Sequence, residues 1–389
     1  MISRYLLRRP LVYSFYVWQR HPYFGHFGLN TNQEKKCLNR VHIGTKIDLG
    51  ELIMNLHPIR VASLGLGWWS DVLADGMVKA NGIEVVSCFT RSKDKRQAFA
   101  KKYNCSYADS YEQLLADNTI DAIINTTPNN IHLETTRQAA NVGKHVFLDK
   151  PIANSVGEGM KIAKICRDAN VKLSIGFQRR RENQFRWVHE EIKAGRFGKI
   201  VQAEANISRD RLGQFEADHW RYTAEGMPGG VMLQIGPHYV DVMEMLMGPI
   251  MEVSGMLSQL VLPGDNPDVA GLVMKHENGA ISTLNAGYAS AGENYVMNIY
   301  GKEASALYSL HTGMYHVKRG EKTPVKMNFD PNDTITEQME EFGACIRNNS
   351  EPEVGGEWAS RSLAVIRAGV KSAREKRYVK IDEIMETGE

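Results

Sequence analysis

The sequence predicts an α/β fold in two parts: a doubly wound N-terminal domain with a parallel sheet, then an α+β domain with an open, largely antiparallel sheet. From Ile59 onward, short apolar runs alternate with segments of helical spacing, which is typical of parallel α/β sheets. The first run ends in a glycine turn, Gly65-Leu66-Gly67. After Phe177, strand-like runs follow one another without helices between them, which indicates antiparallel pairing.

The N-terminal half alternates expected strands and helices. Its apolar runs predict buried parallel strands at 59–64, 85–89, 122–124, 145–148 and 173–175. Helical spacing predicts helices at 71–79, 93–103, 131–142 and 156–168. Ligands of such sheets bind outside the carboxyl ends of the strands. The residues that directly follow each strand are therefore the candidates for a site.

The second half is expected to begin with a helix at 182–194 and a strand at 200–207. Several strands follow within 252–308, separated by turn signals at Asn278-Gly279, Ala291-Gly292 and Gly301-Lys302. Two later helices, 334–347 and 358–374, are expected to return to the first domain. The predicted limits are 54–176 for the first domain, 177–330 for the second and 331–389 for the returning helices.

The composition is typical of a soluble globular protein. With 43% hydrophobic and 24% charged residues, the chain of 389 residues is long enough for two cores and has no apolar run that could span a bilayer. Its five cysteines are widely spaced and form no CxxC motif, so we predict no disulfides and no metal site. This cysteine usage favours a reducing, cytoplasmic compartment.

Residues 1–53 are expected to lie outside both domains. They contain four arginines before the first acidic residue, Glu34, and show no useful periodicity. The arginines are typical of a mitochondrial transit peptide, but the segment has few of the serines that such peptides contain. It also lacks the apolar core of a signal peptide. We favour a third interpretation, in which translation begins at Met54, because codons for Gly50-Glu51 can contain a purine-rich ribosome-binding sequence.

The basic charge of the chain belongs mostly to this segment. Residues 1–53 hold 8 Lys+Arg and 3 Asp+Glu, which leaves 39 basic and 42 acidic residues, a net charge of −3, in the remainder. We therefore expect neither a nucleic-acid nor a membrane partner.

The turn Gly65-Leu66-Gly67 follows a strand and precedes a helix, which is the context of a dinucleotide-binding Rossmann domain. The first glycine makes the tight turn, and the second lets the backbone approach a pyrophosphate at the helix N-terminus. Ser70 stands at the third glycine position and can cap the helix with its hydroxyl. Trp68 and Trp69 could line the cofactor, but we expect packing to be their main role.

The second strand ends in Thr90-Arg91-Ser92, without the carboxylate that binds the ribose 2′-hydroxyl of NAD. An arginine between two hydroxyls favours a 2′-phosphate, with Arg96 assisting, so NADP is preferred over NAD. The alternative is that Arg91 is an ordinary surface cation.

Polar motifs follow the later strands. Thr127-Pro128-Asn129 follows the third, Asp149-Lys150-Pro151 the fourth, and Gln178-Arg179 the fifth. Further along, four-residue spacing can place Gln234 and His238 on one helical face. A lysine and a histidine at this edge are suited to proton transfer with an alcohol.

In order and spacing, these motifs resemble those of the Gfo/Idh/MocA family of nicotinamide-dependent oxidoreductases, from about Ile59 to Lys380. The resemblance implies a Rossmann domain and an open-faced sheet domain that forms homodimers or homotetramers, with Lys150 and His238 as catalytic residues. We expect the cofactor to contact Gly65, Gly67, Trp68, Trp69, Thr90, Arg91, Ser92, Thr127, Pro128, Asn129, Asp149, Lys150 and Gln178. We expect the substrate to contact Lys150, Arg179, Trp220, Gln234, His238 and Tyr239.

Two positions depart from the family pattern. Asp149 stands where the family has Glu, which keeps the charge. Gln234 stands where sugar and inositol members have Asp, and an amide cannot relay a proton. We therefore expect Lys150 and His238 to share proton transfer while Gln234 orients the substrate.

Other residues have weaker claims. Three consecutive arginines cannot all face one site, so we choose Arg179 alone as a carboxylate contact. Trp220, Tyr239 and Tyr288 could line a ring-shaped substrate or pack in the core, and His132 is expected to make a helix-start contact. The predicted function is hydride transfer between NADP or NAD and a secondary alcohol of a sugar, cyclitol or ring diol; the alternative is a non-catalytic, nucleotide-sensing protein of the same fold.

Overall fold

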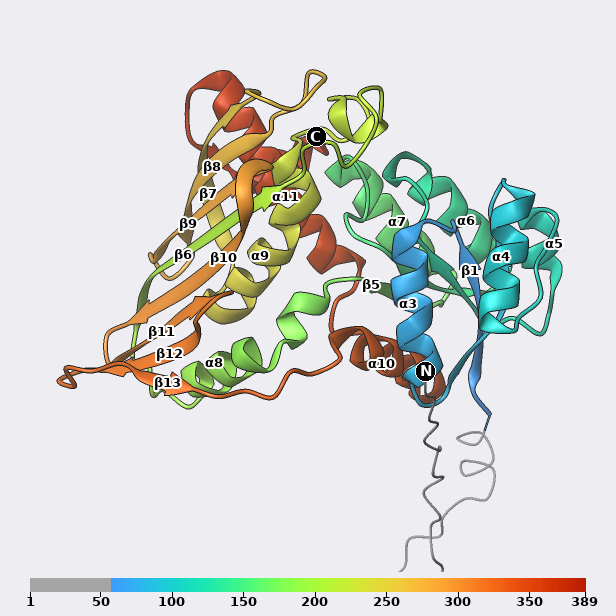
Figure 1. Cartoon of the computed structure of the whole chain (residues 1–389), viewed down its shortest axis with the longest axis horizontal. Coiled ribbons are helices and arrows are strands. Elements are labelled where there is room, and N and C mark those ends of the chain that lie inside the picture. Colours follow the sequence, from blue (N-terminus) through green and yellow to red (C-terminus); the bar gives the residue numbers. More distant parts are fainter. Residues whose placement is uncertain (1–56) are drawn as a thin grey trace, which may run out of the picture. The chain divides into compact units, whose positions relative to one another are not determined.

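The computed structural model describes residues 57–389, so the predicted N-terminal extension and start site lie outside the described residues. The first domain, in the blue to green part of Figure 1, is built on a parallel sheet. Its strand order is β2-β1-β3-β4-β5. Its strands are β1 (Ile59–Leu64), β2 (Ile83–Phe89), β3 (Ala122–Asn125), β4 (His145–Leu148) and β5 (Leu173–Ile175). Most of their side chains are buried, which explains why they read as continuous apolar runs.

Helices cover both faces of this sheet because successive residues of a strand point to opposite sides. Ile123 belongs to one hydrophobic cluster, and its neighbour Ile124 belongs to the other. One face is covered by α3 (Trp68–Lys79), α4 (Lys93–Tyr103) and α10 (Thr334–Asn348), and the other by α5 (Tyr111–Ala116), α6 (His132–Asn141) and α7 (Val156–Asp168). The sheet is therefore doubly wound, and α10 reaches it from near the end of the chain.

The second domain contains a nine-stranded sheet with the order β13-β12-β11-β10-β6-β9-β8-β7-β14. Its strands are β6 (Ile200–Asp210), β7 (Ile250–Ser258), β8 (Val269–His276), β9 (Ile281–Gly287), β10 (Ala289–Gly301), β11 (Ala304–Ser309), β12 (Gly313–Lys318), β13 (Val325–Met327) and β14 (Val379–Lys380). Only the β6–β9 pair is parallel. This arrangement confirms the predicted fold class.

Three helices lie beside one face of this sheet (Figure 1). They are α8 (Asn183–Lys193), α9 (Val231–Met247) and α11 (Gly356–Glu375), and the short α12 (Ile381–Thr387) ends the chain. In β8, buried and more exposed positions alternate, as expected for a strand with one covered face. Within residues 57–389, no helix has both the length and the apolar character needed to cross a membrane.

Some local predictions were wrong. The Ala291-Gly292 signal is not a turn, because β10 continues through it with a register shift against β6 between Ala289 and Asn294. A positive φ of 74° at Gly292 accommodates this irregularity. Helix α3 begins at Trp68, three residues earlier than expected, and α5 was not predicted because it is only 6 residues long.

Candidate functional site

The glycine turn after β1 leaves room at the N-terminus of α3. Gly65 has a φ of 84°, and a Cβ there would lie 2.9 Å from the backbone nitrogen of Thr127. At Gly67, a Cβ would meet nothing within 4 Å, so the backbone is open to an approaching group. An open backbone at a helix N-terminus, where N–H groups lack partners, fits the pyrophosphate of a dinucleotide.

Ser70 does not cap this helix as predicted. The helix already begins at Trp68, so Ser70 lies inside its first turn, and its hydroxyl donates a hydrogen bond of 2.7 Å to the carbonyl oxygen of Gly67. The two tryptophans also differ. Trp69 donates from Nε1 to Oδ1 of Asp149 at 2.9 Å, whereas Trp68 is 63% exposed, so packing is not its main role.

The two arginines that follow β2, Arg91 in the loop and Arg96 in α4, have different surroundings. Arg96 is buried, donates to the carbonyl oxygen of Thr90 at 2.9 Å and pairs with Asp109 at 3.3 Å. It therefore stabilises the loop, and the expectation that it assists a phosphate directly is not supported. Arg91 is exposed and makes no side-chain hydrogen bond or ion pair with residues 57–389, while Ser92 caps α4 through Lys95.

The Thr127-Pro128-Asn129 turn is held by side chains around it. Thr127 donates from its hydroxyl to Asn125 at 2.7 Å, and Asn129 donates to Asn154 at 3.2 Å. His132 contacts the turn through Nε2, which lies 2.8 Å from the carbonyl oxygen of Thr127. Its Nδ1 lies 3.2 Å from the carbonyl oxygen of Ile152. Burial lowers the pKa of His132. Its contacts are those of a structural residue, as expected.

Lys150 joins the cofactor edge to the second domain. Its Nζ donates a hydrogen bond of 2.8 Å to the backbone carbonyl oxygen of Gln234 in α9. Burial lowers the pKa of Lys150, and the charges of Arg221 and Arg179 act in the same direction, against the opposing charge of Asp149. Burial also raises the pKa of Asp149 to about 6, although Lys150 and the hydrogen bond from Trp69 oppose the shift. A lysine with a lowered pKa exchanges its proton more readily near neutral pH.

His238 lies one helical turn beyond Gln234 and is 3% exposed. Its ring contacts Phe177 edge-on at 5.8 Å between centroids, and Nδ1 is buried without a partner among the described residues. Burial, then the charges of Lys150 and Arg179, hold the pKa of His238 well below its usual value of 6.5. Oε1 of Gln178 is likewise buried without a partner among these residues. The structure thus brings Lys150, His238 and Gln178 near one edge, with hydrogen-bonding capacity unused.

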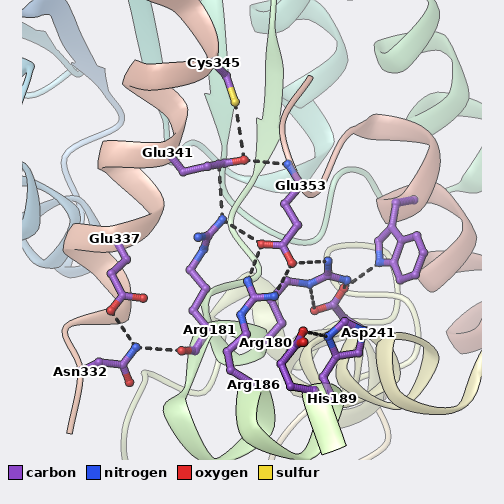
Figure 2. Close-up of polar contacts among 12 residues, drawn as sticks. Arg180, Arg181, Arg186, His189, Asp241, Asn332, Glu337, Glu341, Cys345 and Glu353 are labelled. Atoms are coloured by element: carbon purple, nitrogen blue, oxygen red, sulfur yellow. Dashed lines mark hydrogen bonds and ion pairs between the residues drawn. The ribbon is translucent and has the colours of Figure 1, made fainter. Parts of the chain in front are cut away.

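The three consecutive arginines, 179–181, have different partners, as expected for neighbours that cannot all face one site. Figure 2 shows Arg180 and Arg181 within an ion network that includes Asp241, Glu341 and Glu353. Arg180 binds both carboxylate oxygens of Asp241, at 2.9 and 2.5 Å, and pairs with Glu353 at 3.2 Å. Both arginines are therefore held by acidic partners of the protein.

Arg179 takes another direction and pairs with Glu182 at 2.9 Å. It also lies over the rings of Tyr239 and Tyr295, at 5.3 and 5.2 Å from their centroids. Tyr239 is 2% exposed, and this contact with Arg179 accounts for its position by packing. Arg179 already has a carboxylate partner, which weakens its predicted role as a carboxylate clamp.

A pocket opens beside Gln234 and is lined by Tyr288, which the sequence had suggested as a possible ring contact. Its polar lining also includes Arg211, Arg221 and Asn266, which the sequence did not single out. Trp220 does not line this pocket, but its ring lies 4.3 Å from the guanidinium carbon of Arg221. No periodic signal marks the two arginines, because Arg211 lies just beyond the end of β6 at Asp210 and Arg221 lies in the short turn Trp220–Tyr222.

Both halves of the chain match profiles of known families. Residues 59–177 match an oxidoreductase family with an NAD-binding Rossmann fold, and residues 185–307 match the GFO/IDH/MocA C-terminal domain. A solved structure described provisionally as an NADPH-dependent oxidoreductase, from Desulfitobacterium hafniense, is 31% identical, with a TM-score of 0.81. That match covers 85% of this chain and 99% of the other.

Relatives known by sequence differ in how far the match extends. An uncharacterised oxidoreductase of Schizosaccharomyces pombe is 31% identical over 212 residues, which cover 53% of this chain and 56% of the relative. The D-xylose 1-dehydrogenase (NADP+) of Haloarcula marismortui is 22% identical over 339 residues, 84% of this chain and 94% of the relative.

Proposed function

The chain belongs to the Gfo/Idh/MocA family and is an NAD(P)-dependent oxidoreductase, and on this premise we propose that it acts on a secondary alcohol or ketone carbon of a sugar, cyclitol or ring diol. The observation that carries the proposal is Lys150, which is half-buried at the cofactor edge and hydrogen-bonded to α9 of the second domain at 2.8 Å. A partly desolvated lysine beside a dinucleotide site is suited to hold an alcohol oxygen.

The nicotinamide cofactor supplies the hydride, or accepts it, when bound. In the direction of reduction, Lys150 donates a proton to the substrate oxygen while the hydride reaches the carbon. The neutral amine left on Lys150 regains its proton from solvent through His238, whose neutral imidazole accepts a proton at one ring nitrogen as it releases one from the other. In oxidation, the same protons move in reverse. Gln234 has an amide side chain and orients the substrate without exchanging a proton.

NADP is the preferred cofactor under this proposal. Arg91 is exposed after β2, next to Thr90 and Ser92, and the turn offers no carboxylate that would repel a 2′-phosphate. Arg96 supports the loop through its hydrogen bond to Thr90 and leaves Arg91 as the charged contact.

The second-domain sheet supports an oligomer. Met256 is 83% exposed, and Val273 and Ile281, on the neighbouring strands β8 and β9, are 50% and 40% exposed. Apolar side chains exposed together on a sheet favour association with another surface. We propose a homodimer or homotetramer formed through this sheet, to be checked by light scattering of the purified protein.

The test of the function is a substrate panel. Purified protein is mixed with NADP or NAD and with sugars, inositols and ring diols, and the near-ultraviolet absorbance of reduced nicotinamide is followed. We expect turnover with at least one secondary alcohol and a lower KM for NADP than for NAD. Nucleotide binding without turnover of any compound in either direction would contradict the proposal and favour the nucleotide-sensing alternative.

A further inference from the structure

The pocket beside Gln234, here called the arginine pocket, contains two cations without acidic partners. Arg211 and Arg221 line it, and neither forms an ion pair with any carboxylate of residues 57–389. In both, Nε is buried and has no hydrogen-bond partner in this part of the chain. Both side chains are half-buried, and a buried N–H donor without a partner is costly unless another group satisfies it.

Aromatic rings hold both guanidinium groups in place. Arg221 lies 4.3 Å from the ring centroid of Trp220 and 5.2 Å from that of Phe215. Arg211 lies 6.0 Å from the centroid of Tyr288. Stacking fixes the plane of a guanidinium while leaving its edge free to donate. Arg221 is therefore held against two rings and Arg211 lies beside one, and neither forms an ion pair among the described residues.

Neighbouring arginines do not share this property. Arg179 pairs with Glu182 at 2.9 Å, and Arg209 pairs with Glu293 at 3.0 Å. The positive charge of Arg221 acts to lower the pKa of Asp149, so these two side chains are near each other. Asp149 is also near Lys150, whose charge acts on it more strongly. The charges of Arg221, Arg179 and Arg209 all act on Lys150, so several cations gather in this region.

The arginine pocket adjoins the proposed reaction site through one residue. Gln234 lines the pocket, and its carbonyl oxygen accepts the hydrogen bond from Lys150. Arg221 is also near enough for its charge to act on Lys150, so an anion bound in the arginine pocket would lie close to an alcohol held at Lys150. Guanidinium groups bind planar carboxylates and phosphates with paired hydrogen bonds.

We propose that the substrate is an anion, a hydroxy acid or a sugar phosphate, whose carboxylate or phosphate is bound by Arg211 and Arg221. This inference rests on the proposed function and specifies its substrate class. It assigns the carboxylate clamp to these two arginines in place of Arg179. The neutral amide of Gln234 beside the pocket agrees with it, because a carboxylate there would repel the anion.

The test compares matched substrates and variants. Uronic acids and ring diols with a carboxylate, sugar phosphates, and the corresponding neutral polyols are assayed with the wild type, Arg211→Gln and Arg211→Lys. We expect the anionic compounds to have the higher kcat/KM, and Arg211→Gln to raise their KM by about 10- to 100-fold, in line with the loss of charged hydrogen bonds. Arg211→Lys should recover part of the loss, and the preferred anion distinguishes carboxylate from phosphate.

Two controls show whether the effect belongs to the arginine pocket. Arg319→Gln removes an exposed arginine of the same domain and should change no KM. The KM for NADP should be unchanged in Arg211→Gln; a parallel rise would assign the cation to the cofactor and overturn the inference. Equal kcat/KM for anionic and neutral substrates would also overturn it, while leaving the proposed function intact.

If no compound is turned over, equilibrium binding decides the question. Binding of the same carboxylates, phosphates and neutral polyols is followed by tryptophan fluorescence, with Trp220→Phe to identify the signal from beside Arg221. Salt-sensitive binding of an anion that is lost in Arg211→Gln would support the inference even though the proposed function had failed. Binding of none of them, or of the neutral compounds equally, would overturn it.

Discussion

In the ion network around Glu353, each buried arginine lies against a carboxylate, whereas in the arginine pocket Arg211 and Arg221 have none among the described residues. The network joins η2 (Gln178–Arg181), α8, α9 and the segment before α11 (Figure 2). Both regions contain arginines next to aromatic rings. The difference is whether the protein itself supplies the anion, and that separates a structural cluster from a site that can bind a ligand.

The pKa shifts of the carboxylates reflect the same difference. Burial alone would raise the pKa of Glu353, but its hydrogen bond with Arg186 and the charges of Arg180 and Arg181 lower it to about 2. For Asp149 burial prevails, and the pKa rises to about 6. A well-paired carboxylate stays ionised at any physiological pH, while one with little pairing lies close to its titration range.

The largest effect is expected for Lys150→Met, which keeps the length of the side chain and removes the amine. Turnover should fall by about 10³-fold, because the variant has no group to hold and protonate the substrate oxygen. The melting temperature should change little, because methionine keeps the length and apolar stem of the side chain. Steady-state assays and thermal unfolding check both points. A variant that keeps about a tenth or more of the turnover would contradict the role of Lys150.

The next largest effect concerns the ion network. Asp241→Asn leaves Arg180 buried with a neutral partner and should lower the free energy of unfolding by about 3 kcal/mol. Denaturant titration measures the change, and Asp168→Asn, in an exposed pair with Lys164, is the matched control with an expected loss of under about 1 kcal/mol. If turnover per folded molecule fell as strongly as in Lys150→Met, the separation between the two regions would be wrong.

A smaller effect is expected for His238→Asn, about 10²-fold on kcat/KM for oxidation. Because the pKa of His238 lies well below 6.5, the imidazole is neutral at neutral pH and becomes protonated only as the pH falls further. The wild-type rate should therefore decline at acidic pH, below 6.5, and the variant should lack that decline. The same acidic limb in the variant would assign it to another group, with Asp149 the next candidate.

The smallest effect concerns the cofactor loop. Arg91→Ala should raise the KM for NADP by about 10-fold and leave the KM for NAD nearly unchanged, because only NADP carries the 2′-phosphate. Arg137→Ala, at another exposed arginine, should change neither. Equal changes in both KM values would show that Arg91 does not distinguish the cofactors.

Much of the first domain was predictable from local patterns. The bounds of β1, β4 and β5 agree with the apolar runs, because buried parallel strands need apolar residues at nearly every position. The carboxyl ends of these strands then place the glycine turn, Thr127 and Lys150 at one edge. A short helix such as α5 and a strand irregularity such as that near Gly292 were missed, since neither leaves a clear periodic signal.

Which charged side chains have partners could not be predicted, because partners come from distant parts of the chain. Arg180 meets Asp241 across 61 residues and Glu353 across 173, and Arg96 turns inward against Thr90 while Arg91 does not. Periodicity and turn chemistry act over a few residues, so the sequence sufficed for the fold class, the cofactor edge and the candidate lysine. Ion pairing and desolvation depend on packing between domains, so the unpaired arginines beside Gln234 became visible only in the folded chain.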